Sequence, residues 1–183
     1  MRKIIAIIGL PATGKSTIMK KFLEKASPTW ECVEEVPLVT AHYSPTRDVY
    51  VLGKYEEGEK FPGTDRYSMA VQPAAIKFVQ TCKDNIVFEG DRLNTVSFLE
   101  FLAEQPDTEL QILVITANPA IIESRHKDRA DTQSEQFKKG RETKIENVRS
   151  NFMLMDNIKT FEHNTPQDTD HIVEYLTSQL PEL

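Results

Sequence analysis

The stretch Gly9-Leu10-Pro11-Ala12-Thr13-Gly14-Lys15-Ser16 decides how the chain is interpreted, because it has the spacing G-x-x-x-x-G-K-[ST]. The apolar run 3–8 precedes it and predicts a strand buried on both faces. Residues 15–25 follow it and carry apolar side chains at helical spacing. A glycine-rich turn between a strand and a helix directs backbone N–H groups and a helix N-terminus at an anion. We therefore name residues 9–16 the phosphate loop and expect it to bind a nucleoside triphosphate.

Each residue type in and after the phosphate loop has a predicted role. We expect the Lys15 ammonium to reach the β- and γ-phosphates and the Ser16 hydroxyl to ligate Mg²⁺. Thr17 is expected at the α-phosphate. The residues predicted to surround the nucleotide are Gly9, Ala12, Thr13, Gly14, Lys15, Ser16 and Thr17. ATP and Mg²⁺ are the expected cofactors, and the sequence does not distinguish ATP from GTP.

Strand and helix patterns alternate along the rest of the chain. Further strand patterns cover 31–36, 85–89, 110–116 and 158–163, and further helical patterns cover 68–83, 95–104 and 170–180. This alternation predicts one α/β domain over residues 1–183, a three-layer sandwich with about five parallel strands. Residues 37–55 are β-rich around a four-residue turn and predict an inserted β-hairpin. The charged segment 123–149 predicts a helical lid.

Composition restricts the class of protein further. The 183 residues are 39% hydrophobic and 27% charged, which is typical of a globular protein and not of a disordered one. No apolar run approaches the roughly 20 residues that span a bilayer, so we expect a cytoplasmic protein with no membrane partner. Two cysteines make no disulfide framework, and we expect both thiols to be reduced and buried. The net charge of −6 excludes a basic surface over the whole chain, but segment 123–149 has eight Lys/Arg against six acids.

Acidic and basic residues follow the strand pattern 85–89. The carboxyl ends of parallel strands line the ligand crevice, so Glu89, Asp91 and Arg92 are expected beside the phosphate loop. We predict Glu89 in the Mg²⁺ shell and Asp91 as the base or the group that orients the acceptor, with an exchange of these roles left open. Arg92 is predicted to pair with an acceptor phosphate or with one of the acids.

The lid segment supplies further predicted contacts. Arg125 and Arg129 share a helix face at spacing i, i+4, and a closing lid that carries them would neutralise charge during phosphoryl transfer. Arg141 occurs later in the same segment and is a predicted substrate contact.

The string 61–68 lies where an acceptor site would be built. Asp65 and Arg66 are predicted to contact the acceptor, and Gln72, one turn further on, to recognise a base edge. In the alternative interpretation, Thr64 or Asp65 only caps the helix that follows.

Together, the phosphate loop, the Asp91-Arg92 pair and the Arg125/Arg129 pair resemble the adenylate- and thymidylate-kinase-like branch of P-loop nucleoside and nucleotide kinases. The strings G-T-D-R-Y-S-M-A-V-Q-P (63–73), E-G-D-R-L (89–93) and G-R-E-T-K (140–144) resemble a phage-encoded subgroup. That subgroup is related to kinases of 5-hydroxymethyl pyrimidines within DNA. The resemblance implies a P-loop NTPase fold, a location in the host cytoplasm, and a base-recognition loop at 164–168. The hairpin predicted at 37–55 departs from the pattern of small nucleotide kinases.

The acceptor of the phosphoryl group stays open at this stage. The net charge favours a free nucleoside or nucleotide, since binding a duplex needs several phosphate contacts. A hydroxymethylated base in DNA is the alternative acceptor, which would have to be flipped out or single-stranded and contacted by the basic lid segment. A nucleotide switch or a non-kinase ATPase is the alternative of another class. The chain lacks the N-K-x-D and D-x-x-G signatures of GTPases, and 183 residues leave little room for the extra domain of a motor.

Overall fold

The computed structural model describes residues 1–57, 62–128 and 135–182. Within these residues a single sheet has seven strands in the order β2-β3-β4-β5-β1-β6-β7. The central part is parallel and consists of β4 (Val49–Leu52), β5 (Asn85–Glu89), β1 (Arg2–Gly9), β6 (Thr108–Thr116) and β7 (Ile158–Glu162). Two strands, β2 (Glu31–Val36) and β3 (Val39–Ser44), extend the sheet in antiparallel pairing beside β4.

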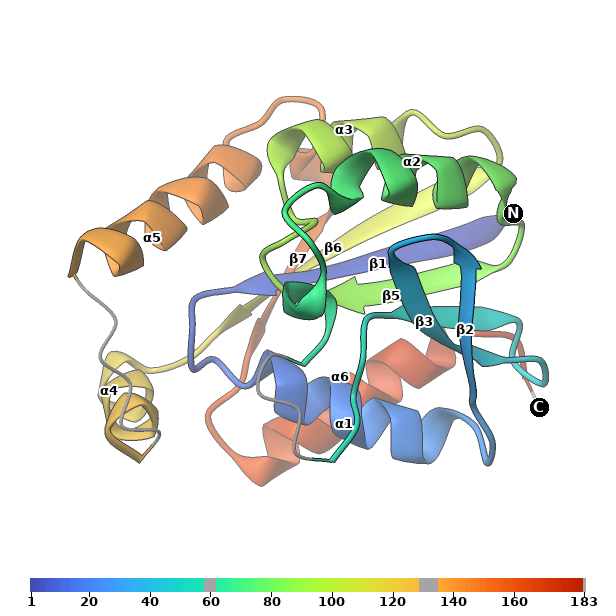
Figure 1. Cartoon of the computed structure of the whole chain (residues 1–183). Coiled ribbons are helices and arrows are strands. Elements are labelled where there is room, and N and C mark those ends of the chain that lie inside the picture. The colour runs from blue at the N-terminus through green and yellow to red at the C-terminus, as the bar shows by residue number, and fades with distance from the viewer. Residues whose placement is uncertain (58–61, 129–134, 183) are drawn as a thin grey trace.

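Helices cover both faces of the sheet (Figure 1). On one face lie α2 (Val71–Thr81) and α3 (Val96–Ala103), and on the other lie α1 (Lys15–Ala26) and α6 (Pro166–Ser178). The alternation of side chains along β1 explains both layers, because Ile4, Ala6 and Ile8 pack in the core under α2 and α3. Ile5 and Ile7 point the other way, into the core with α1 and α6. The predicted mixed α/β class is confirmed.

The edge of the sheet differs from the sequence prediction. The patterns predict a strand at 31–36 followed by a separate hairpin over 37–55, whereas the structure joins all three segments into one antiparallel meander, β2-β3-β4. Val36 pairs with Val39, so only Pro37 and Leu38 connect β2 to β3. The expectation that both thiols are buried is wrong, because Cys32 is exposed on β2 and Cys82 is only half-buried. At the edge of a sheet, one face of the strand is left open to solvent.

The start of α2 also differs from the prediction. Neither Thr64 nor Asp65 caps this helix, whose N-cap position is Ala70 with no side-chain bond. Both side chains instead reach across to the end of β5, from the short 3₁₀ turn η1 (Thr64–Arg66). Thr64 Oγ1 donates to the carbonyl of Glu89 at 2.8 Å, and Asp65 accepts the backbone N–H of Asp91 at 2.8 Å. Segment 64–66 therefore supports the carboxyl edge of the sheet.

Two helices lie beyond that carboxyl edge, α4 (Pro119–Asp128) and α5 (Glu135–Arg149) (Figure 1). They occupy the described parts of the predicted lid segment 123–149. A second 3₁₀ turn, η2 (Met155–Asn157), leads into β7. No helix in the described part of the chain is long and apolar enough to cross a membrane.

Candidate functional site

The phosphate loop turns sharply between β1 and α1. Ala12 and Gly14 both adopt positive φ, at 66° and 91°, and Gly14 is the N-cap residue of α1. Thr13 closes the turn, because its backbone N–H and its Oγ1 both donate to the carbonyl of Leu10, at 3.3 and 2.8 Å. The first N–H groups of α1 have no acceptor one turn earlier in the helix. The loop therefore brings a set of backbone donors to the carboxyl edge of the sheet, where an anion can bind.

The Lys15 ammonium spans the phosphate loop. Its Nζ donates to the carbonyls of Gly9 and Leu10, at 2.8 and 3.0 Å. Burial lowers the pKa of Lys15, while the nearby carboxylates of Glu89 and Asp65 act in the opposite direction. The cation is thus held at the mouth of the loop, next to two acids.

Glu89 is a buried acid at the end of β5, with 3% of its surface exposed. Tyr55 Oη donates to Glu89 Oε1 at 2.8 Å. Burial raises the pKa of Glu89 to about 7, although Lys15 and the Tyr55 hydrogen bond favour the ionised form. A divalent cation nearby would favour ionisation strongly. The donor chemistry therefore fits a magnesium site.

Asp91 is bound to helix α5. Its Oδ2 lies 3.0 Å from Arg141 Nη1 and 3.2 Å from Lys144 Nζ, and Lys144 also donates to the Asp91 carbonyl at 2.9 Å. The Arg141 guanidinium carbon lies 4.6 Å from the centre of the Phe137 ring. Two of the predicted site residues, Asp91 and Arg141, thus meet directly, and Lys144 is a further cation of the predicted lid segment to which the sequence analysis assigned no contact.

Asp65 organises the turn that follows β5. Its Oδ1 accepts the backbone N–H groups of Asp91 and Arg92, at 2.8 and 3.3 Å. The Arg92 guanidinium contacts the sulfur of Met69. Arg66, in the same 3₁₀ turn as Asp65, is exposed. The structure therefore brings Asp65, Asp91 and Arg92 together, with Asp65 bonded to the backbone of the other two.

Two further predicted residues have different positions. Gln72 lies in the first turn of α2 and bonds to the start of α3, where its Nε2 donates to Ser97 Oγ at 3.1 Å and its Oε1 accepts from Thr95 Oγ1 at 3.2 Å. Arg129 lies outside the described residues.

Arg125 connects α4 to the phosphate loop. Its two terminal nitrogens donate to the carbonyls of Ala12 and His163, both at 3.0 Å. It also borders a cavity of about 330 Å³ whose other lining residues are Thr17, Lys21, His163, Asn164, Thr165, Pro166 and Thr169.

The chain between β7 and α6 forms one wall of this cavity. Asp168 Oδ2 accepts the backbone N–H groups of Asn164 and Thr165, at 2.8 and 3.0 Å, and Thr165 Oγ1 caps α6 in return. These hydrogen bonds lower the pKa of Asp168. The capping box thus fixes the segment 164–168 beside Arg125.

His163 is a site residue that the sequence analysis missed. It is buried, and its Nδ1 lies 2.7 Å from the carbonyl oxygen of Thr13 in the phosphate loop. Its Nε2 lies 2.6 Å from Thr169 Oγ1. Burial is the main cause that lowers the pKa of His163, so the neutral ring is favoured. No spacing signal predicts this contact, because the two partners are 150 residues apart in the chain.

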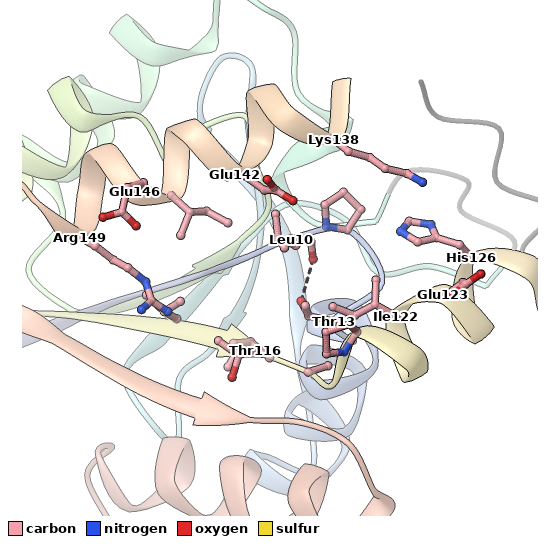
Figure 2. A pocket seen from close by; sticks show the side chains of 16 residues that line it. Leu10, Thr13, Thr116, Ile122, Glu123, His126, Lys138, Glu142, Glu146 and Arg149 are labelled. Atoms are coloured by element: carbon pink, nitrogen blue, oxygen red, sulfur yellow. Dashed lines mark hydrogen bonds between the residues drawn. The ribbon is translucent and has the colours of Figure 1, made fainter. Parts of the chain in front are cut away.

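A larger cavity of about 540 Å³ lies between α4, α5 and the end of β6 (Figure 2). Leu10 and Thr13 of the phosphate loop border it, together with Ile122, Glu142 and Arg149 among others. Lys15, Ser16, Glu89 and Asp91 are not among its lining residues. The hollow is therefore adjacent to the phosphate loop but separate from the charged groups described above.

Comparisons with known proteins assign no family to the chain. No protein-family model matches the chain, and no curated protein matches it. Among solved structures, the chain is similar to a gluconokinase from Sinorhizobium meliloti 1021, with 13% identity and a TM-score of 0.46 over 98% of this chain and 99% of that one. It is also similar to an uncharacterized protein from Eubacterium ventriosum ATCC 27560, with 16% identity and a TM-score of 0.48 over 97% and 99%.

Proposed function

We propose that the chain is an ATP- and Mg²⁺-dependent kinase that transfers the γ-phosphoryl group to a nucleotide-like acceptor. The observation that carries this proposal is the placement of two acids, Glu89 and Asp91, beside Lys15 of the phosphate loop, with Arg141 and Lys144 of α5 paired with Asp91. Phosphoryl transfer depends mainly on positioning and on neutralisation of charge. The backbone N–H groups of the phosphate loop would position the phosphates. The cations of α5 would neutralise their charge.

The donor nucleotide would lie along the phosphate loop. Its base would occupy the cavity of about 330 Å³ beside Arg125 and Asn164, since Thr17 connects that cavity to the start of α1. Its phosphates would then meet the backbone donors of the loop and the Lys15 ammonium. To do so, they would replace the carbonyls of Gly9 and Leu10 as partners of Lys15.

The residues proposed to hold Mg²⁺ are Ser16 and Glu89. A hydroxyl at the start of α1 and a buried carboxyl are hard oxygen donors of the kind that Mg²⁺ prefers. When bound, Mg²⁺ would neutralise charge on the β- and γ-phosphates. Tyr55 fixes the orientation of the Glu89 carboxyl through its hydrogen bond.

The acceptor would approach from the side of Asp65, Arg66 and Arg92. For a hydroxyl acceptor, the acceptor oxygen forms a bond to the γ-phosphorus as the bond to the β-phosphate oxygen breaks, ADP leaves, and the hydroxyl proton passes to a carboxylate. Asp91 is the proposed proton acceptor or orienting group, once Arg141 and Lys144 have turned from it toward phosphate oxygens.

The proposed charge-neutralising arginines come from several parts of the chain. Arg92 follows β5, Arg125 belongs to α4 and Arg141 to α5. Arg129, four residues after Arg125, is proposed for the same role from its spacing alone.

A second candidate acceptor is a 5-hydroxymethyl pyrimidine within DNA. Lys127 on α4 and Lys139 on α5 are exposed, and they favour this candidate because exposed lid cations can contact DNA phosphates. Lys127 also lies 3.6 Å from Glu123, which reduces its contribution.

The experiment that tests the proposal uses γ-labelled ATP and Mg²⁺. Parallel reactions contain nucleosides, nucleoside monophosphates, and DNA with or without 5-hydroxymethyluracil. Label on a free nucleoside or nucleotide supports the first acceptor, and label only on hydroxymethylated DNA supports the second. Label released as inorganic phosphate in every reaction would refute the kinase and favour an ATPase or a switch.

The matched variants for this assay lie on one helix. Lys15→Ala should abolish transfer and leave the fold intact, because Lys15 acts on phosphate charge. Lys20→Ala removes an exposed cation from the same helix and should transfer normally. Near-normal transfer by Lys15→Ala would contradict the assignment of the phosphate loop.

A further inference from the structure

The His163 ring lies directly against the phosphate loop, at the end of β7. A carbonyl oxygen only accepts, so Nδ1 must donate its proton to Thr13 O over the 2.7 Å between them. In the neutral ring Nε2 is then an acceptor, and the Thr169 hydroxyl donates to it at 2.6 Å. Both ring nitrogens of His163 therefore have hydrogen-bond partners, and these two bonds fix the orientation of the ring.

The same ring fills the space behind Gly14. A Cβ atom on Gly14 would lie 2.3 Å from Cε1 and from Nδ1 of His163, closer than any real contact. Gly14 has a φ of +91°, a conformation that glycine adopts at little cost. Glycine at this position therefore allows both the turn of the loop and the close approach of the imidazole.

The bond to Thr13 determines where the next N–H group points. The carbonyl of Thr13 and the N–H of Gly14 belong to one planar trans peptide, in which they point in opposite directions. His163 holds the carbonyl, so the Gly14 N–H is directed to the side of the peptide away from His163. In a phosphate-binding loop, an N–H that starts the helix is a contact for the phosphate oxygens.

We propose that His163 is a positioning residue for triphosphate binding, which sets the Thr13–Gly14 peptide so that its N–H faces the phosphates. This inference rests on the proposed function. His163 also borders the cavity assigned to the donor base, and its carbonyl accepts from Arg125. Arg125 holds the preceding carbonyl of the loop, that of Ala12. One residue thus connects the base cavity, the lid helix α4 and the phosphate cradle.

The test is a direct binding measurement by calorimetry with Mg²⁺-ATP, and with tripolyphosphate as a probe of the phosphate contacts alone. His163→Ala should weaken the binding of both by about tenfold or more, because it releases the peptide. His163→Asn places an amide donor near Nδ1 and should retain most of the affinity. Added imidazole should restore ATP binding to His163→Ala. The matched control is His171→Ala, an exposed histidine on α6 that should bind as the unaltered protein does.

Several outcomes would overturn the proposal. Equal ATP affinity of His163→Ala and the unaltered protein contradicts it, as does weakening of ATP binding with no effect on tripolyphosphate. If His163→Ala does not fold, Thr169→Val serves instead, since it retains the ring but removes the donor to Nε2. It should weaken ATP binding about threefold, and unchanged binding overturns the proposal. An unaltered protein that binds no ATP would refute the proposed function itself, which is a distinguishable result.

Discussion

The substitution Gly14→Ala tests the packing behind the phosphate loop. An alanine held at a φ of +91° is strained by about 1–2 kcal/mol. Its Cβ would also lie 2.3 Å from two atoms of the buried His163 ring, and moving such a ring costs about 1–3 kcal/mol. The two effects add, so we expect the free energy of unfolding to fall by about 2–5 kcal/mol. Urea denaturation followed by far-UV circular dichroism measures this difference.

The same substitution at another glycine is the control, and we expect it to change the free energy of unfolding in the opposite direction. Gly140 lies within α5, and among the described residues a Cβ there would meet nothing within 4 Å. Alanine favours a helix interior over glycine, so Gly140→Ala should raise the free energy of unfolding by about 0.5–1 kcal/mol. A loss below about 1 kcal/mol for Gly14→Ala would refute the argument, because backbone strain alone should reach that value.

Two further predictions concern acidic residues. The pKa of Asp168 is lowered by hydrogen bonds from two loop N–H groups, so its stabilising contribution is present above its unfolded pKa of about 3.8 and is lost as the pH falls through the lower folded value. The melting temperature of the unaltered protein should therefore exceed that of Asp168→Asn by a constant amount from pH 8 to about 5, and the gap should shrink below about pH 4; a gap independent of pH would contradict this. Asp91→Asn should lower kcat about 100-fold or more with a hydroxyl acceptor, if Asp91 takes the proton, and should lower KM for ATP because Arg141 and Lys144 lose a competing anion. Steady-state kinetics with ATP varied checks both, and an unchanged kcat would exclude Asp91 as the base.

Elements with strong local patterns are predictable from the sequence. The predicted strand 85–89 has the same bounds as β5, and the predicted helix 15–25 differs from α1 by one residue. Continuous apolar runs and helical spacing are local signals, and the glycine-lysine-serine spacing fixes the junction between them. The same local signals placed Glu89 and Asp91 at the carboxyl end of a strand, which is where the structure has them.

Features that depend on contacts between distant segments were not predictable. The turn between β2 and β3 has Leu38 at a φ of 77°, a position where glycine or asparagine would have signalled a hairpin. Asp65 looked like a helix cap by its local sequence, yet it bonds to residues 26 and 27 positions away. His163 has no motif of its own, and its role follows only once β7 is placed beside the phosphate loop. In each case, contacts between segments distant in the sequence determine a conformation or a hydrogen-bond partner that the local sequence leaves undetermined.

Four cations of the described site have oxygen partners from the chain itself. Lys15 bonds to loop carbonyls, Arg125 bonds to two further carbonyls, and Arg141 and Lys144 share the Asp91 carboxylate. At each cation, a phosphate oxygen must therefore replace a protein oxygen as the hydrogen-bond acceptor. The net gain in binding free energy at each cation is only the difference between the two hydrogen bonds. A single phosphate gains little from such an exchange, whereas a triphosphate that engages several cations at once adds the differences. The exchange also removes two cations from Asp91, which would leave its carboxylate available for the acceptor only after the donor is bound. The decrease in KM for ATP expected for Asp91→Asn follows from this competition, and the decrease in kcat follows from the loss of the carboxylate.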